Sequence, residues 1–243
     1  MSGDFRLNNY NDYELFYETK HKSEDLQKKF VYGLSEFYRN EISKSKFIAN
    51  PGCYPTSILL PLIPLIKDKQ IKSNNIIIDS KSGYSGAGRG VHKKYKYQNL
   101  YDSLKAYGVG FHRHNSEIEQ TLKEYSNKKI EFNFTPHLTP MFRGILSTIY
   151  VEVNKNVSQN KIKKVLTDYY KNDIFIKILK NDSFISTNDV INTNRCHISV
   201  CKTKNKNKFI ILSIIDNLIK GGSGQGVQNM NLKFGFPLTT GLI

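Results

Sequence analysis

Lys46-Phe-Ile-Ala-Asn-Pro-Gly-Cys53-Tyr-Pro-Thr56 is the stretch that decides the fold of this 243-residue chain. Residues 47–49 predict a short buried strand, Asn50-Pro-Gly52 predicts a turn, and the apolar run 56–66 predicts a helix. We expect Pro61 and Pro64 to kink or shorten that helix, because proline removes a backbone donor. The order strand, tight turn and helix is typical of a protein with a layered sheet and covering helices.

The rest of the chain continues this alternation. The predicted strands cover residues 76–79, 130–134, 145–153, 174–179, 196–202 and 209–215. The predicted helices run from a capping box at Ser116 to about Tyr125, from a cap at Ser158, and from Val227 after the glycine-rich residues 221–226. We therefore predict an α/β (α+β) protein, and a mixed sheet because the last two strands are joined by a short hairpin loop.

The composition is strongly basic, with 36 Lys and Arg against 21 Asp and Glu and a formal charge of +15. Lysine dominates and is spread along the chain, whereas nucleic-acid readers rely on clustered arginine. We therefore expect no nucleic-acid partner, and steering of an anionic small substrate instead. No apolar run is long enough for a membrane span, and the N-terminus resembles no targeting signal, so the cytosol is the expected compartment. Three cysteines predict no disulfide framework.

Cys53 is the candidate nucleophile. A cysteine between a strand and the start of a helix meets unpaired backbone N–H groups and the positive end of the helix dipole, which lower a thiol pKa. The alternative is a structural cysteine buried at a tight turn.

His112 and His114 are the candidate proton donor and acceptor. In an extended segment these two residues face the same side, while Arg113 between them points away. Imidazoles suit proton transfer near neutral pH. The alternatives are a polar surface loop or a metal site, but no third ligand accompanies the pair, so we expect no metal.

The glycine- and serine-rich stretch Ser82-Gly-Tyr-Ser-Gly-Ala-Gly-Arg89 can bring backbone N–H groups and one guanidinium to an anion. A flexible turn is the alternative interpretation.

Taken together, these segments resemble the N-acetyl-gamma-glutamyl-phosphate reductase family. The motifs that carry the resemblance are Ala49-Asn-Pro-Gly-Cys-Tyr-Pro-Thr56, Ser85-Gly-Ala-Gly-Arg89, His112-Arg-His114 with Glu117-Ile-Glu-Gln120, Phe134-Thr-Pro-His-Leu-Thr-Pro140 with Arg143-Gly144, and Asp216-Asn217 through Gln228-Asn229. The earlier segments Gly3-Asp-Phe-Arg-Leu7 and Val31-Tyr-Gly-Leu34 also look like family segments. The motifs stand in the family's order over nearly the whole chain.

The resemblance implies a fold and a domain division. The fold is a glyceraldehyde-3-phosphate-dehydrogenase-like catalytic domain with a mixed sheet, plus the tail end of a truncated Rossmann domain. Residues 1–52 would be the remnant of the dinucleotide-binding domain, 53–215 the catalytic and oligomerisation domain, and 216–243 a C-terminal helix that returns to the first. A homo-oligomer, dimer or tetramer, built through the large sheet is expected.

The resemblance also implies a reaction in arginine biosynthesis. The Cys53 thiolate attacks the acyl phosphate of N-acetylglutamyl phosphate, and NADPH reduces the resulting thioester to the semialdehyde. One histidine moves protons, and we prefer His114 to His112 because it lies nearer the following helix. The expected substrate-binding residues are Arg89, Arg113 and Asn50, and the expected cofactor-binding residues are Ser82, Gly83, Ser85, Gly86 and Asn217.

Two departures from the family pattern remain. Ser116 stands where the family has proline, a change that should be harmless because serine can cap a helix. The second departure is larger: the sequence shows no opening Rossmann strand with a glycine-rich phosphate loop, and we therefore expect weak or absent cofactor binding by this chain. Two alternatives stand beside this reaction: a related reductase of aminoadipyl phosphate or aspartyl phosphate, since the motifs do not specify the length of the acyl chain, and an inactive oligomerisation domain that lacks the cofactor loop.

Overall fold

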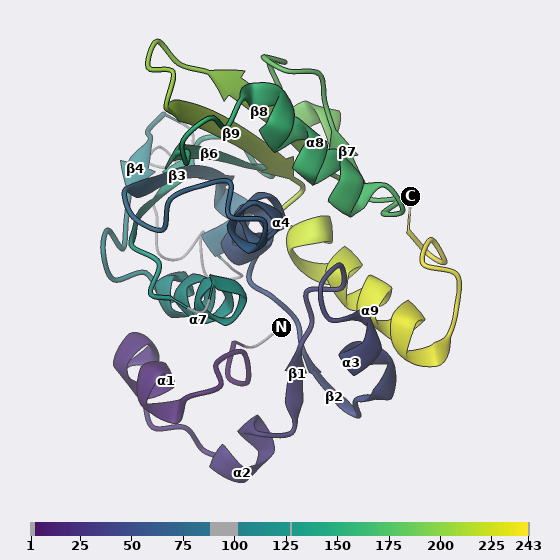
Figure 1. Cartoon of the computed structure of the whole chain (residues 1–243). Helices are drawn as coiled ribbons and strands as arrows, with labels where there is room; N and C mark the ends of the chain where they lie inside the picture. Colours follow the sequence, from purple (N-terminus) through teal and green to yellow (C-terminus); the bar gives the residue numbers. More distant parts are fainter. Residues whose placement is uncertain (1–2, 88–101, 127, 243) are drawn as a thin grey trace.

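The computed structural model describes residues 3–87, 102–126 and 128–242. Its largest element is a seven-stranded sheet (Figure 1). The strands are β3 (Ile76–Gly83), β4 (Lys105–Ala106), β5 (Phe132–Thr139), β6 (Ile145–Glu152), β7 (Ile176–Ile178), β8 (Cys196–Lys202) and β9 (Lys208–Ile215). Their order across the sheet is β4-β5-β3-β6-β9-β8-β7.

The sheet is mixed, as predicted. β3 pairs in parallel with β5, and β7 with β8, whereas the other neighbours are antiparallel. β8 and β9 form the expected hairpin, with Lys202 opposite Phe209. β5 ends five residues later than expected, at Thr139, because its second half pairs residue for residue with β3 as far as Gly83.

One face of this sheet is buried and the other is partly exposed. Along β6, Ile145, Ile149 and Val151 are buried, while Tyr150 between them is exposed. The buried face packs against α4 (Cys53–Lys67), which is flanked by α7 (His114–Ser126) and α8 (Gln159–Tyr170). Period-two alternation of this kind is what a sheet covered on one side requires.

The helix α4 runs through its prolines without ending, so the expected shortening at Pro61 and Pro64 was wrong. Its side chains are buried on all sides, which is typical of a helix inside a core. Pro64 lacks the N–H that would bond the carbonyl of Leu60, and the Tyr170 hydroxyl donates to that carbonyl instead.

The N-terminal elements form a separate layer on the other side of α7 and α4 (Figure 1). They are α1 (Tyr10–Tyr17), α2 (Glu24–Gln27), β1 (Phe30–Tyr32), α3 (Arg39–Lys44) and β2 (Phe47–Ala49), and β1 pairs in parallel with β2. The chain returns to this layer at its C-terminal end, where α9 (Gly224–Phe234) packs against α3. The predicted domain boundaries remain a prediction.

Two other local predictions were wrong. The glycine-rich residues 221–226 are helical, since a π-helix, η3 (Ile219–Ser223), leads directly into α9. The helix α7 begins at His114 rather than at Ser116, whose hydroxyl donates to the carbonyl of Arg113 (2.9 Å). The predicted cap at Ser158 is confirmed, because its side chain accepts from the Lys161 N–H. Two short 3₁₀ turns are η1 (Tyr84–Ala87) and η2 (Thr187–Asp189).

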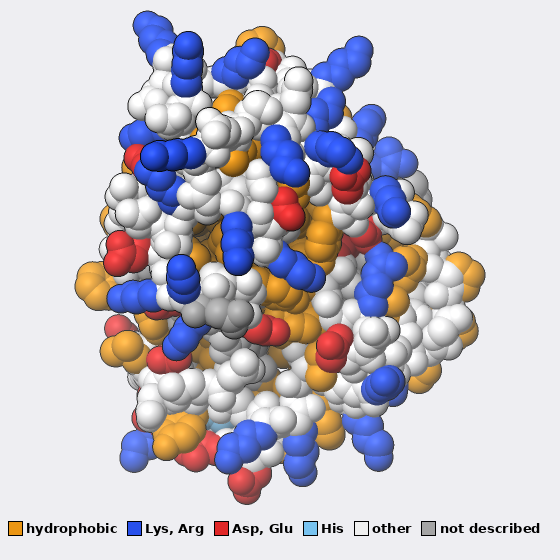
Figure 2. Space-filling view, in the orientation of Figure 1, with side chains coloured by type: hydrophobic (Ala, Val, Ile, Leu, Met, Phe, Trp, Pro, Cys, Tyr) orange, Lys and Arg blue, Asp and Glu red, His pale blue; other side chains and the backbone are white. Residues whose placement is uncertain are grey.

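The basic side chains are distributed rather than clustered. Figure 2 shows Lys and Arg scattered over the visible face, with acidic side chains and apolar patches between them. Within the described residues, none of the helices has both the length and the apolar character needed to cross a membrane.

Candidate active site

Cys53 is the first residue of α4, directly after Gly52, whose backbone is extended. The residue as a whole is partly accessible to solvent, whereas its thiol is buried. The π-helix η3 lies against it, because a Cβ added at Gly221 would stand 2.7 Å from the Cβ of Cys53. The predicted position at a strand-to-helix turn is therefore confirmed, with glycines on two sides that let other groups come close.

The predicted lowering of the Cys53 pKa was wrong. Burial raises the pKa of the Cys53 thiol above its usual value. The Arg6 guanidinium and the backbone N–H groups of Tyr54 and Cys53 act in the opposite direction, as expected at a helix N-terminus, but they do not outweigh burial. The resting side chain is a thiol, so its use as a nucleophile requires a group that accepts its proton.

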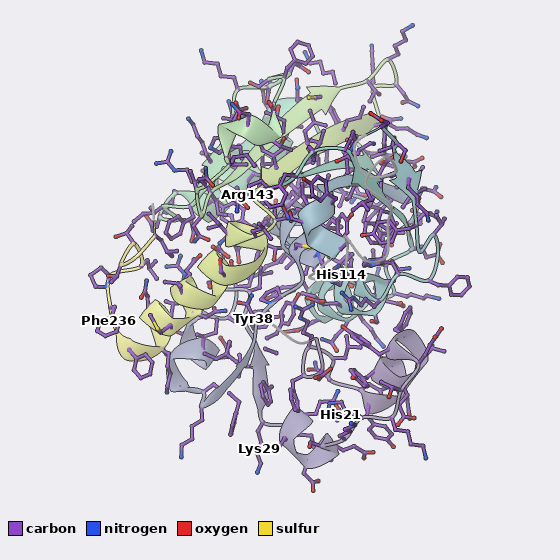
Figure 3. All side chains as sticks on the ribbon, turned by 180° about the vertical axis from the view of Figure 1, so that it is seen from behind. His21, Lys29, Tyr38, His114, Arg143 and Phe236 are labelled. Atoms are coloured by element: carbon purple, nitrogen blue, oxygen red, sulfur yellow. The ribbon has the colours of Figure 1, made fainter. Side chains whose placement is uncertain are left out.

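The imidazole ring of His114 lies against this turn, and its position is labelled in Figure 3. A Cβ added at Gly52 would lie 2.5 Å from Nε2 of His114, so only glycine leaves room for the ring there. Burial first, and then the neighbouring His112 and Arg6, keep the pKa of His114 well below its usual value. The ring is neutral at neutral pH, and its buried Nδ1 has no hydrogen-bond partner among the described residues.

His112 lies next to His114. It does not belong to a strand, but the expected convergence is confirmed: the two imidazole rings meet with centroids 4.7 Å apart, while Arg113 between them is exposed. His112 Nδ1 accepts the backbone N–H of His114 (3.1 Å), and its ring stands among those of Tyr54, Tyr107 and Phe134. Burial lowers the pKa of His112 to about 4.

Arg6 and Glu117 belong to the site and were not predicted as site residues. Arg6 Nε donates to the carbonyl of Asn50 (2.7 Å), and its guanidinium pairs with Glu117 (3.4 Å). Glu117 also accepts the N–H of Gly52 (2.7 Å) and the hydroxyl of Tyr32 (2.6 Å). Arg6 lies in Gly3-Asp-Phe-Arg-Leu7 and Glu117 in the motif after His114, so both stood in segments that carried the resemblance.

The predicted substrate-binding residues Asn50 and Arg113 make separate contacts. The Asn50 amide is engaged, since Nδ2 donates to Gly222 O (3.0 Å) and Oδ1 accepts from Asn229 (3.1 Å). Arg113 is exposed and its guanidinium lies 5.9 Å from the centre of the Tyr17 ring. Arg89 lies outside the described residues. Their roles stay predictions.

The predicted cofactor-binding residues do converge. Asn217 Nδ2 donates to the Ser85 hydroxyl (3.0 Å), and a Cβ added at Gly86 would lie 2.7 Å from Ser82 Oγ and 3.6 Å from Asn217 Nδ2. Gly83 ends β3 just before them, and its N–H donates to Gly144 O (2.9 Å). The result is a compact cluster of uncharged polar groups, which we call the Ser82–Asn217 cluster and define by these residues.

A thiol, a neutral imidazole and a guanidinium, each from a different segment, therefore meet at the start of α4. This set can perform nucleophilic attack on an electrophilic carbonyl, accept the thiol proton and balance an anionic group. Over the part of the chain that the structure describes, no group of three or more His, Cys, Asp or Glu side chains is placed to hold a metal ion.

Comparison with known proteins identifies a family model and named relatives to which the chain is similar. Residues 53–217 match the family described as semialdehyde dehydrogenase, dimerisation domain. A protein from Arabidopsis thaliana named probable N-acetyl-gamma-glutamyl-phosphate reductase, chloroplastic, is 47% identical over 243 residues, which are the whole chain and 61% of that protein. N-acetyl-gamma-glutamyl-phosphate reductase of Halothermothrix orenii is 45% identical over 243 residues, again the whole chain and 70% of that protein. The chain thus spans about three fifths to seven tenths of the length of these relatives.

Solved structures show the same fold at low sequence identity. Aspartate semialdehyde dehydrogenase II from Vibrio cholerae superposes with a TM-score of 0.67 at 16% identity, over 85% of this chain and 69% of that one. A probable aspartate-semialdehyde dehydrogenase from Pseudomonas aeruginosa gives 0.66 at 14% identity, over 84% and 68%. The predicted fold class is confirmed.

Proposed function

The chain belongs to the N-acetyl-gamma-glutamyl-phosphate reductase family, and from this premise we propose that it supplies the catalytic part of an NADP-dependent oxidoreductase. The proposed reaction reduces N-acetyl-L-glutamyl 5-phosphate to N-acetyl-L-glutamate 5-semialdehyde and phosphate, a step of arginine biosynthesis. The substrate comes from the relatives' names and the pathway from the family resemblance, and the chemistry is argued below from the residues of this chain.

The observation that carries the proposal is the meeting of Cys53, His114 and Arg6 at the start of α4. Gly52, the residue before Cys53, leaves room for the His114 ring. Arg6 lies close enough to Cys53 for its positive charge to act to lower the thiol pKa. A cysteine with a proton acceptor and a cation close by is the arrangement that acyl transfer to sulfur requires.

We assign the proton transfer to His114. The raised pKa of Cys53 means that its proton has to leave as the sulfur attacks, and the neutral His114 imidazole can accept it. The sulfur then bonds to the acyl carbon, and the bond from that carbon to the phosphate oxygen breaks, so that phosphate departs with the electron pair and a thioester remains. His112 holds the backbone N–H of His114 and is assigned a supporting role.

The Ser82–Asn217 cluster is the proposed holding point for the nicotinamide end of NADP(H). It suits a carboxamide, because the hydroxyl groups of Ser82 and Ser85 and the amide of Asn217 converge there around Gly86. When bound, NADPH supplies the hydride that reduces the acyl carbon. The cleavage of the carbon–sulfur bond then releases the aldehyde and returns the electron pair to Cys53.

Positive charge beside the nucleophile suits the anionic substrate, which carries an α-carboxylate and an acyl phosphate. Arg6 is the cation that acts on Cys53 in the structure, and we propose that it also faces the anionic substrate. Arg113 and Arg89 remain proposed contributors, and the excess of lysine favours anion steering at longer range. The same chemistry would serve aminoadipyl or aspartyl phosphate. The choice of N-acetylglutamyl phosphate as the substrate therefore rests on the family alone.

A second candidate function is a subunit-interface module without activity of its own. The matched family is described as a dimerisation domain, and the outer face of the large sheet exposes Ile77 and Tyr150. We propose that a second copy of the chain covers this face, in a dimer or tetramer. A second copy bound at this face is compatible with the catalytic proposal. The interface function stands alone only if the catalytic test fails.

The catalytic proposal is tested in the direction of aldehyde oxidation. Protein that carries this chain is incubated with N-acetylglutamate semialdehyde, phosphate and NADP⁺, and NADPH formation is followed by absorbance. We expect phosphate-dependent turnover, and a loss of about a thousandfold or more in Cys53→Ser. The matched control is Cys201→Ser, a partly exposed cysteine in β8, which should keep the rate. Retained turnover in Cys53→Ser would rule out the assigned nucleophile.

A further inference from the structure

Glu117 is a buried carboxylate at the junction of four segments around Cys53. Its side chain is 1% exposed. One oxygen accepts both the Gly52 N–H (2.7 Å) and the Tyr32 hydroxyl (2.6 Å), and the other pairs with Arg6 (3.4 Å). The carboxylate therefore joins α7 to the turn before Cys53, to β1 and to the N-terminal segment.

Arg6 is held at two points. Its Nε donates to the carbonyl of Asn50, three residues before Cys53, while its terminal nitrogen meets Glu117. An arginine side chain has many rotamers, and fixing it in one of them costs conformational entropy unless such contacts offset that cost. Without Glu117, Arg6 would lose one of these two contacts and keep only the other, to the Asn50 carbonyl.

We propose that Glu117 is a positioning residue, whose carboxylate fixes the Arg6 guanidinium beside the Cys53 sulfur and ties the Gly52 N–H to the helix that carries His114. The consequence for turnover rests on the proposed function. The consequence for the Cys53 sulfur does not, because it follows from the contacts of the chain alone.

Two effects of opposite sign make this role testable. As a negative charge, Glu117 raises the pKa of Cys53, whereas Arg6 lowers it. Removing the charge of Glu117 while leaving Arg6 in place would therefore lower the pKa of Cys53. If Glu117 holds Arg6 in place, its neutralisation releases Arg6 and raises the pKa of Cys53 instead. The sign of the change separates a positioning residue from a nearby charge.

The experiment measures the pH dependence of Cys53 alkylation by iodoacetamide, with the modified peptide identified by mass spectrometry. Glu117→Gln is the main variant, because its amide oxygen can still accept from Gly52 and Tyr32 but offers no charge to Arg6. Arg6→Gln measures the loss of the guanidinium itself. Glu119→Gln is the matched control, since Glu119 is exposed on the same helix.

We expect both variants to raise the pKa of Cys53, Arg6→Gln more than Glu117→Gln because it keeps the charge of Glu117, and to slow alkylation near neutral pH by about three- to tenfold, because the thiolate fraction falls tenfold per unit of pKa. The double variant should be no slower than Arg6→Gln, and Glu119→Gln should match the unmodified chain. A lower or unchanged pKa in Glu117→Gln overturns the proposal, and so do additive effects in the double variant.

A second variant covers the case in which Glu117→Gln does not fold. Glu117→Asp keeps the charge but withdraws it by one methylene from Arg6, so positioning predicts a raised Cys53 pKa, and an unchanged value contradicts it. All these measurements use neither substrate nor cofactor. An inactive protein with the expected pKa changes would refute the proposed function alone, whereas an active one without them would refute only the role of Glu117.

Discussion

At the residue scale, Cys53 shows that a helix N-terminus does not by itself make a thiolate. The N–H groups of Cys53 and Tyr54 and the charge of Arg6 all favour ionisation, yet burial of the sulfur outweighs them. The neutral state of His114 is the counterpart of this result, because a protonated imidazole could not take the thiol proton. Burial thus disfavours the charged form of both groups, so the resting pair is a neutral thiol and a neutral imidazole, and the proton transfer has to be coupled to the attack of the sulfur.

The buried histidines predict a loss of stability in mild acid. The pKa of His112 is about 4 in the folded chain against 6.5 ordinarily, so between these values the unfolded chain binds a proton that the folded chain does not. The free energy of unfolding should therefore fall with pH from 6.5 downward, by up to about 1.4 kcal/mol per pH unit for this residue. Urea unfolding at pH 7 and pH 5 measures it.

His112→Gln is the variant that isolates this contribution. The Gln side chain carries no titrating group, so the drop between the two pH values should be smaller than in the unmodified chain. An equal drop in both proteins would show that other groups cause the acid dependence.

At the element scale, the decisive contact is between the start of α4 and η3. Helical glycine is ordinarily a weakness, and replacing it by alanine where there is space raises stability by about 0.4–1 kcal/mol. Gly221 is different, because its missing side chain leaves the room that Cys53 occupies. A π-helical turn placed against a reactive residue fits the frequent occurrence of such turns at functional sites.

Gly221→Ala should therefore be destabilising. The added Cβ would lie 2.7 Å from the Cβ of Cys53 and 3.1 Å from Ile215 Cδ1, so either α4 or η3 has to shift. We expect the free energy of unfolding to fall by about 1–3 kcal/mol, as for an overpacked core, and Cys53 alkylation to change with it. Met230→Ala, an exposed position of α9, is the control. A more stable Gly221→Ala would contradict the close approach.

At the scale of the whole molecule, a buried ion pair joins the N-terminal part of the chain to its C-terminal part. Lys220 in η3 donates to Glu36 (2.6 Å) and to Gln228 (2.8 Å), and the charged pair is inaccessible to solvent. Burial alone would raise the pKa of Glu36, but Lys220 and the hydrogen bonds around it lower that pKa instead. The pair fastens the C-terminal segment to the N-terminal layer, and with it the η3 turn that touches Cys53.

The outer face of the large sheet predicts an oligomer. Ile77 and Tyr150 are exposed on neighbouring strands and face each other in register. Exposed apolar side chains in one patch are typical of an interface. Light scattering of the purified chain should give at least twice its monomer mass, and Tyr150→Glu should reduce that mass. Leu15→Glu, at an exposed position of α1, should leave it unchanged. A monomeric unmodified chain would refute this interface.

The sequence by itself determined the class of fold, the mixed sheet and the place of Cys53 at a strand-to-helix turn. These features are local: hydrophobic period, turn residues and a hairpin are written within ten or fifteen neighbouring positions. The family motifs also brought Ser82, Ser85, Gly86 and Asn217 to attention, and the structure gathers them.

Only the tertiary structure decided the protonation states, the continuation of α4 through Pro64 and the membership of Arg6 and Glu117 in the site. Each of these depends on groups far apart in sequence: Tyr170 satisfies the carbonyl that Pro64 leaves free, and Arg6 meets Glu117 across 111 positions. Burial and long-range pairing are properties of the packed chain, and no local pattern encodes the dielectric surroundings that set the pKa of Cys53.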